Sequence, residues 1–192
     1  MYSPDDSTNA LVFWATSALT SAERILSEAD FSPWSSSRKH GQSGLVRRAD
    51  AALMLLALRN VLSAAEWSAS DLREHAEDID DTIATFRHLL PNLVNARDVL
   101  EHFDEYALGV GRFQRGSPEM FYFDLVEGAE EPTVVVGRFT LSVLHAPDAC
   151  RWLVISLLAR VPLPPEHVDR AEQLLNEVLS EVEASERSET PE

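Results

Sequence analysis

The chain has 192 residues, 45% of them hydrophobic, which suits one domain with a substantial core. Its formal net charge of −16 disfavours non-specific binding to nucleic-acid phosphates. The single cysteine, Cys150, rules out an internal disulfide and a cysteine-rich metal site. No apolar run reaches the roughly 18 residues of a membrane span, and the acidic start Met1–Asp6 lacks the basic residues of a secretory signal. We expect a cytoplasmic protein that does not enter a membrane, and its bias toward arginine and alanine is typical of bacterial, GC-rich coding.

Apolar residues recur every three or four positions over residues 8–29, which predicts a first helix. Serine, glycine and basic residues dominate 35–44 and predict a mobile loop. The segment 45–67 is apolar over most of its circumference near Ala51–Leu58, which predicts a central, buried helix. Ser70 is a suitable N-cap for a third helix, because acidic residues follow in its first turn.

Pro91 interrupts that third helical pattern and predicts a new helix over about 91–108, which stops at Gly109. The spacing of apolar residues then changes. Residues 120–126 and 133–144 are rich in β-branched and aromatic types, and a turn-forming acidic segment separates them. This pattern predicts a β-hairpin.

Two more helices are expected after the hairpin, over about 148–160 and 166–182. Residues 184–192 are expected to form a disordered acidic tail. The predicted fold is therefore a single domain over 1–183 that is mainly α. It is an up-and-down helical bundle with a β-hairpin insertion near 120–144, packed beneath the two C-terminal helices.

The helix predicted over 91–108 has one apolar and one polar side when its residues are placed at about 100° each. The apolar side holds Leu93, Ala96, Leu100, Phe103 and Ala107. The polar side holds Arg97, Asp98, Glu101, His102 and Glu105. Arg97 and His102 lie about 140° apart around the axis. They can converge on one small ligand only if the arginine reaches across or a second subunit completes the site.

The segment Arg97-Asp98-Val99-Leu100-Glu101-His102 has an arginine, a polar residue directly after it, and a histidine after four intervening residues. This pattern resembles the Rx4-6H motif of the HEPN superfamily, and the expected helical scaffold over residues 8–108 is also similar to that family. The resemblance implies a metal-independent endoribonuclease without a cofactor, often a toxin or defence factor. It also implies a homodimer in which the motifs of two subunits face one cleft.

Within this resemblance each motif residue has a role. His102 is the general acid or base at the ribose 2′-hydroxyl or the leaving oxygen, because an imidazole can exchange protons near neutral pH. Arg97 binds the scissile phosphate and stabilises its developing charge. Asp98, four residues before His102, orients the histidine or the backbone at the site.

Non-catalytic interpretations remain open. Arg97 with Glu101, and Asp98 with His102, are i,i+4 pairs of the kind that any solvated helix face carries. The alternative is a HEPN-like helical interaction module whose acidic surface binds a basic protein partner. A third class is a helical regulator that binds a small molecule, with the hairpin as a lid.

The best candidates for RNA contact outside the motif are the cations Arg38, Lys39, Arg47 and Arg48, although their sequence context favours a solvated loop over an RNA-binding one. No metal site is expected. The acids and histidines near 74–78 and 101–105 do not have the Glu-x-x-His spacing of helical carboxylate metal sites.

Overall fold

The computed structural model describes residues 4–27, 37–71, 76–108, 110–113, 122–127 and 132–159. In chain order the elements are α1 (Pro4–Ser27), α2 (Ser37–Asp71), α3 (Ala76–Leu89), α4 (Leu93–Glu101), α5 (Phe103–Ala107), β1 (Phe123–Glu127), β2 (Pro132–Val136), β3 (Phe139–Ser142) and α6 (His145–Leu158). The predicted fold class is confirmed, since the chain is mainly helical with one small antiparallel sheet. Within the described ranges, none of the helices combines the length and the apolar character needed to cross a membrane.

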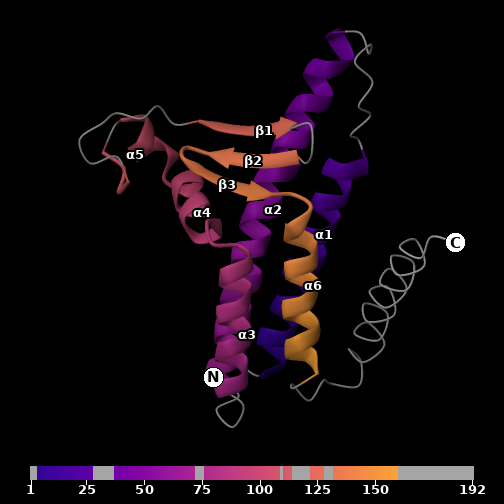
Figure 1. Ribbon diagram of the computed structural model, residues 1–192, viewed down its shortest axis with the longest axis vertical. Helices are drawn as coiled ribbons and strands as arrows, with labels where there is room; N and C mark the ends of the chain where they lie inside the picture. The colour runs from indigo at the N-terminus through magenta and orange to yellow at the C-terminus, as the bar shows by residue number, and fades with distance from the viewer. Residues whose placement is uncertain are drawn as a thin grey trace, which may run out of the picture.

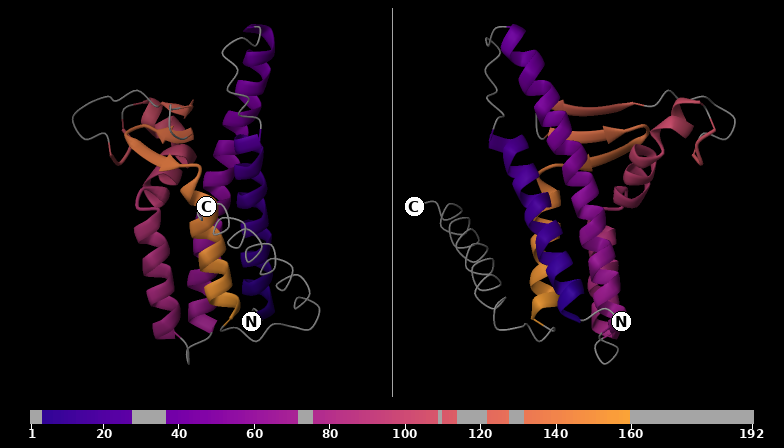
Figure 2. Two further views of the ribbon diagram at one scale, coloured as in Figure 1. Left: turned by 45° about the vertical axis from the view of Figure 1, so that its right-hand side comes forward. Right: turned by 180° about the vertical axis from the view of Figure 1, so that it is seen from behind.

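Within the described residues, four helices form the bundle. Figure 1 shows α1, α2, α3 and α6 running side by side along the long axis, with the sheet, α4 and α5 gathered toward one end. Helix α2 contacts every other bundle helix as well as α4 and β1, so the prediction of a central second helix is confirmed. Its first turns extend beyond the other helices (Figures 1 and 2).

The core follows from the spacing of apolar residues. On α1 the buried positions alternate between four- and three-residue steps, which puts them on one stripe facing α2. They are Leu11, Ala15, Ala18, Ala22 and Ile25. Three of these are alanines, so the two helix backbones can approach closely. The buried residues of α2 between Ala51 and Ala65 spread around the helix, which explains how it can contact neighbours on several sides.

Two local predictions for α2 are wrong. The helix begins at Ser37, so 37–44 is helical and not a loop, and it continues through Ser70, which is therefore no N-cap. A helix that packing has already nucleated can propagate through serine and glycine, whose propensities are only modestly unfavourable. Serine also has a place inside a helix, because its hydroxyl can donate to a carbonyl one turn back, as Ser68 Oγ does to Ala64 O at 3.0 Å.

The sheet has three antiparallel strands in the order β1-β2-β3, where the sequence predicted a two-stranded hairpin. Leu125 lies opposite Val134, which in turn lies opposite Leu141. The segment predicted as one long strand turns at Gly137, which has a φ of 57° that favours glycine. The backbone N–H of Gly137 donates to the carbonyl of Tyr122 at 2.6 Å, which closes the turn against the chain entering β1.

The sheet contacts α4 through β2 and β3, α2 through β1, and α6 through β3. The predicted packing against the first C-terminal helix is therefore present only at β3. Helix α6 begins a turn's length from β3 at His145, slightly earlier than the sequence indicated. The helix expected over 166–182 and the tail expected over 184–192 lie outside the described residues.

Candidate functional site

The helix predicted over 91–108 is two helices that meet at His102. Helix α4 ends at Glu101 and α5 starts at Phe103, while His102 has a φ of −104° and a ψ of 34°. Backbone hydrogen bonding of the helical kind continues into the junction, because the His102 N–H donates to the Asp98 carbonyl at 3.1 Å. The candidate catalytic histidine therefore sits where the chain changes direction.

This junction changes which side chains are buried. Phe103, predicted in the apolar stripe, is 56% exposed, whereas Tyr106 is buried. On α4 the predicted burial of Leu93 and Ala96 is confirmed, and Val99 is buried as well. Val99 was not predicted to be buried, because its cover is the β2–β3 turn, where a Cβ at Gly137 would stand 3.9 Å from Val99 Cγ1, and a helical wheel cannot show such a contact.

Arg97 and Glu101 form an ion pair one helical turn apart on α4. About a third of each side chain is exposed, so the pair lies at the surface, on the polar side that the wheel predicted. The guanidinium is held along the helix by its own neighbour. A phosphate that binds Arg97 has to replace this carboxylate.

The imidazole of His102 is half exposed and lies near Glu105, with Nδ1 3.7 Å from Oε1. At this separation the two groups attract each other only when the ring is protonated, and they form no hydrogen bond. Asp98 is linked to His102 through the backbone, and the ring contacts Glu105 instead of the predicted Asp98. The change of backbone direction at His102 accounts for this, because the ring no longer follows the helical spacing of α4.

A groove of about 710 Å³ lies between α1 and α2, and Glu101 forms part of its wall. Its apolar lining includes Phe13 and Leu53, which are 61% and 53% exposed. Sequence reasoning did not single out this groove. The signal was available, because Phe13 falls off the stripe of buried residues on α1 and is therefore an apolar side chain on the outer surface.

The expected RNA contacts do not form one cluster of free cations. Arg47 is 5% exposed, and its Nη2 donates to the carbonyl of Ile25 at 3.0 Å, so it stabilises the end of α1. The burial of Arg47 argues against the predicted contact with RNA. Arg48 joins α2 to β1, with its Nε 2.6 Å from Asp124 Oδ1. Arg38 and Lys39 lie in the first turn of α2, and their side chains are outside the described part of the structure.

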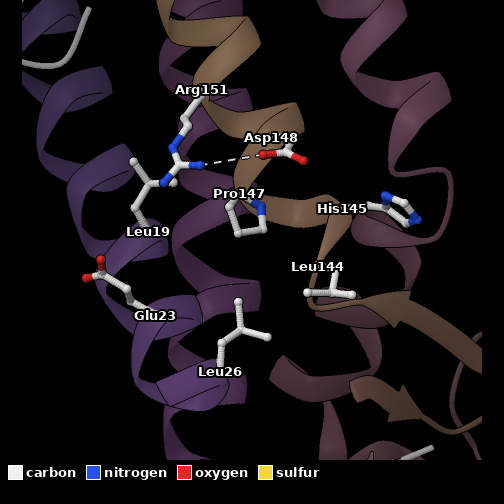
Figure 3. Close-up of a pocket in the computed structure, with 8 residues that line it drawn as sticks. All are labelled: Leu19, Glu23, Leu26, Leu144, His145, Pro147, Asp148 and Arg151. Atoms are coloured by element: carbon white, nitrogen blue, oxygen red, sulfur yellow. Dashed lines mark ion pairs between the residues drawn. The ribbon is translucent and has the colours of Figure 1, made fainter. Parts of the chain in front are cut away.

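A second hollow, of about 340 Å³, lies between α1 and the start of α6 (Figure 3). Leu19 and Leu26 supply apolar wall from α1, and Arg151 pairs with Asp148 at 3.5 Å across its α6 side. Glu23 is also in its lining, so the charges are mixed and select no ligand of one sign. The motif residues take no part in this hollow.

Among the residues whose placement is described, no group of three His, Cys, Asp or Glu side chains is arranged to hold a metal ion. His75 and Glu74 lie outside those residues.

The chain matches no family model, no curated protein and no solved structure.

Proposed function

We propose that this chain is a HEPN-like, metal-independent endoribonuclease that acts as a homodimer in the bacterial cytoplasm. The observation that carries the proposal is the position of the motif beside the α1–α2 groove. Glu101, the partner of Arg97, lines a surface hollow whose apolar walls are open to solvent. A second copy that covers this hollow brings two motifs to one interface.

The groove has the chemistry of a subunit contact. Phe13 and Leu53 leave large apolar surfaces in water, and burying them is favourable by about 25 cal/mol per Å². Exposed apolar patches rimmed by polar groups mark interaction sites. Here Arg24 and Glu101 supply charges of both signs in the lining, so two copies related by a two-fold axis can present opposite charges to each other.

His102 has the access that a proton-transfer group needs. Its ring projects from the α4–α5 junction and is half exposed, so a ribose 2′-hydroxyl can reach it. In the proposed reaction the imidazole removes the 2′-hydroxyl proton while the 2′-oxygen attacks the adjacent phosphorus. The bond between phosphorus and the 5′-oxygen breaks. The imidazole, now protonated, donates its proton to this 5′-oxygen.

Arg97 can exchange its carboxylate for a phosphate at little cost. A surface i,i+4 pair contributes about 0.3–0.5 kcal/mol. A guanidinium–phosphate contact with two parallel hydrogen bonds is stronger than that. The Arg97–Glu101 pair therefore positions the guanidinium in the free protein and opens when RNA binds.

The test is incubation of total RNA with purified protein in EDTA. Wild-type protein should degrade RNA, and His102→Ala and Arg97→Ala should not, because each removes one reacting partner. His88→Ala is the matched control, since His88 is an exposed histidine on α3, away from the motif. Equal survival of RNA with wild type and His102→Ala would overturn the proposal.

The second candidate is a non-catalytic interaction module that binds a basic protein segment. The favouring observation is that a carboxylate lies beside each motif side chain, Glu101 beside Arg97 and Glu105 beside His102. Calorimetric titration with an arginine-rich helical peptide tests it. Binding that Glu101→Gln and Glu105→Gln both weaken, in a protein that leaves RNA intact, would favour this function.

A further inference from the structure

Two arginines differ from the others in the described part of the chain. Arg112 and Arg138 have no carboxylate partner there. Each places its guanidinium over the ring of Phe113 instead, at 5.3 and 5.5 Å from the centroid. The other arginines with described side chains bond a carboxylate or a carbonyl; they are Arg24, Arg47, Arg48, Arg59, Arg87, Arg97 and Arg151. Among the arginines with described side chains, two without a described carboxylate partner are the exception in a chain of net charge −16.

The ring under these arginines is held from two sides. Phe113 stacks on Tyr106 of α5 with centroids 6.3 Å apart, and it meets Phe139 of β3 edge-on at 5.1 Å. Gly111 lies directly on the Tyr106 ring, where a Cβ would come within 2.6 Å of it, so only glycine allows this approach. The aromatic cluster therefore fixes Phe113, and Phe113 fixes the two guanidinium groups.

The cluster lies beside the candidate catalytic helix. Tyr106 comes one helical turn after His102. Burial raises the pKa of Tyr106, and the charges of Asp98 and Arg112 act on this pKa in opposite directions. Asp98 of the motif and Arg112 are thus close to the same ring.

Arg138 approaches from the sheet. It follows Gly137 in the β2–β3 turn, and that turn lies over α4, since a Cβ at Gly137 would stand 3.9 Å from Val99 Cγ1. The guanidinium is also 5.2 Å from the ring centroid of Phe139. Two segments that are far apart in sequence therefore bring cations to the end of the molecule that carries His102.

We infer that Arg112 and Arg138 bind backbone phosphates of single-stranded RNA on either side of the nucleotide presented to His102. The inference rests on the proposed function, which makes RNA the substrate. Guanidinium groups stacked on a ring keep their hydrogen-bond donors free at the edges, and these donors match phosphate oxygens. Because Asp98 and Glu105 are near and the chain is acidic, attraction at long range is weak, and binding depends on these direct contacts.

The experiment measures binding separately from cleavage. Fluorescence anisotropy of a short fluorescein-labelled single-stranded RNA is followed with His102→Ala protein, which should bind without cutting. The titration is repeated from about 50 to about 200 mM salt, because each phosphate contact contributes about 0.7 to the slope of log affinity against log salt for single strands. Adding Arg112→Gln and Arg138→Gln should weaken binding about tenfold or more and lower the slope by about 1.4.

Three variants make the result specific. Arg87→Gln removes an exposed arginine that pairs with Glu66 far from the cluster, and it should leave both affinity and slope unchanged. Arg112→Lys with Arg138→Lys keeps the charges and should keep the slope. If the double glutamine variant loses its helical circular dichroism, Arg112→Gln alone is measured, because Arg112 is exposed, and its slope should fall by about 0.7.

The inference is overturned if the glutamine variants bind with the affinity and slope of Arg87→Gln, or if the His102→Ala parent does not bind RNA. Its failure is distinguishable from failure of the proposed function. Protein that binds RNA through these arginines but leaves RNA intact would contradict the nuclease and not the binding surface. Protein that cleaves RNA equally well without them would contradict only the binding surface.

Discussion

The guanidinium of Arg97 and the carboxylate of Glu101 are paired on one surface of α4, and the same Glu101 lines the groove between α1 and α2. One acidic residue thus connects the candidate phosphate-binding group with the candidate subunit interface. This connection gives Glu101 two opposing effects on an RNA substrate. It positions Arg97, and it repels phosphate.

Replacing Glu101 with glutamine should increase RNA affinity. The variant removes one negative charge and frees Arg97, and because the surface i,i+4 pair contributes about 0.3–0.5 kcal/mol, KM for RNA cleavage should fall about twofold at low salt. Steady-state cleavage of a fluorogenic RNA measures this. Glu66→Gln is the control, since Glu66 pairs with Arg87 elsewhere and should leave KM unchanged. A fall in kcat with Glu101→Gln would mean that the carboxylate takes part in the reaction.

Periodicity predicted the bundle because the fold buries continuous stripes. The spacing of Leu11, Ala15 and Ala18 on α1 marks the face that packs on α2, and the nearly all-round apolar character of α2 marks it as central. Both signals are local in sequence, so a single amino-acid sequence is sufficient to detect them. The β-rich segment was recognisable in the same way, although its extra turn depends on the single residue Gly137.

The site was less predictable because long-range contacts shape it. The helix breaks at His102, where Tyr106 packs against Phe113 and Phe113 packs against Phe139, residues that lie further along the chain. Arg47 was expected to face RNA because it is a cation in a polar stretch. The structure buries it against the carbonyl of Ile25, and neither residue carries a local signal for that pairing.

The proposed homodimer is tested by a variant that should change the oligomeric state. Phe13→Glu places a carboxylate in the apolar groove, and burying an unpaired charge at an interface is unfavourable by several kcal/mol. Size-exclusion chromatography with light scattering should give a dimer for wild type and a monomer for Phe13→Glu, and the monomer should have lost RNA cleavage. Leu89→Glu is the matched control, because Leu89 is an exposed leucine on α3 outside the groove, and it should remain dimeric. A monomeric wild type would contradict the dimer.

Two glycines should respond oppositely to replacement by alanine. Gly137 has a φ of 57°, so Gly137→Ala should destabilise the fold by about 1–2 kcal/mol even though the space for a Cβ is adequate. Gly44 lies within α2 with nothing within 4 Å of its Cβ position, so Gly44→Ala should stabilise by about 0.5–1 kcal/mol. Thermal unfolding should show melting temperatures that move in opposite directions, by about 2–4 °C per kcal/mol. Equal shifts would contradict the turn at Gly137 or the helix at Gly44.

The buried thiol of Cys150 should make stability depend on alkaline pH. Burial in α6 raises its pKa to about 12, whereas an exposed thiol in the unfolded chain titrates near about 8.5. Between these values the unfolded chain binds fewer protons than the folded one, so the free energy of unfolding falls as pH rises, by up to about 1.4 kcal/mol per unit. Below the lower value both states keep the proton, and the contribution is constant.

Urea unfolding of wild type and Cys150→Ala from about pH 7 to about pH 10 isolates this effect, because other alkaline groups, such as Tyr106, titrate in both proteins. Alanine has no proton to lose, so the decline above about pH 8.5 should be shallower in the variant, while the difference between the two proteins should be constant below it. Parallel curves over the whole range would mean that water reaches the thiol in the folded chain. A thiol reagent such as Ellman's provides an independent reading: it should modify Cys150 only as the protein unfolds, since the side chain is fully enclosed by the bundle.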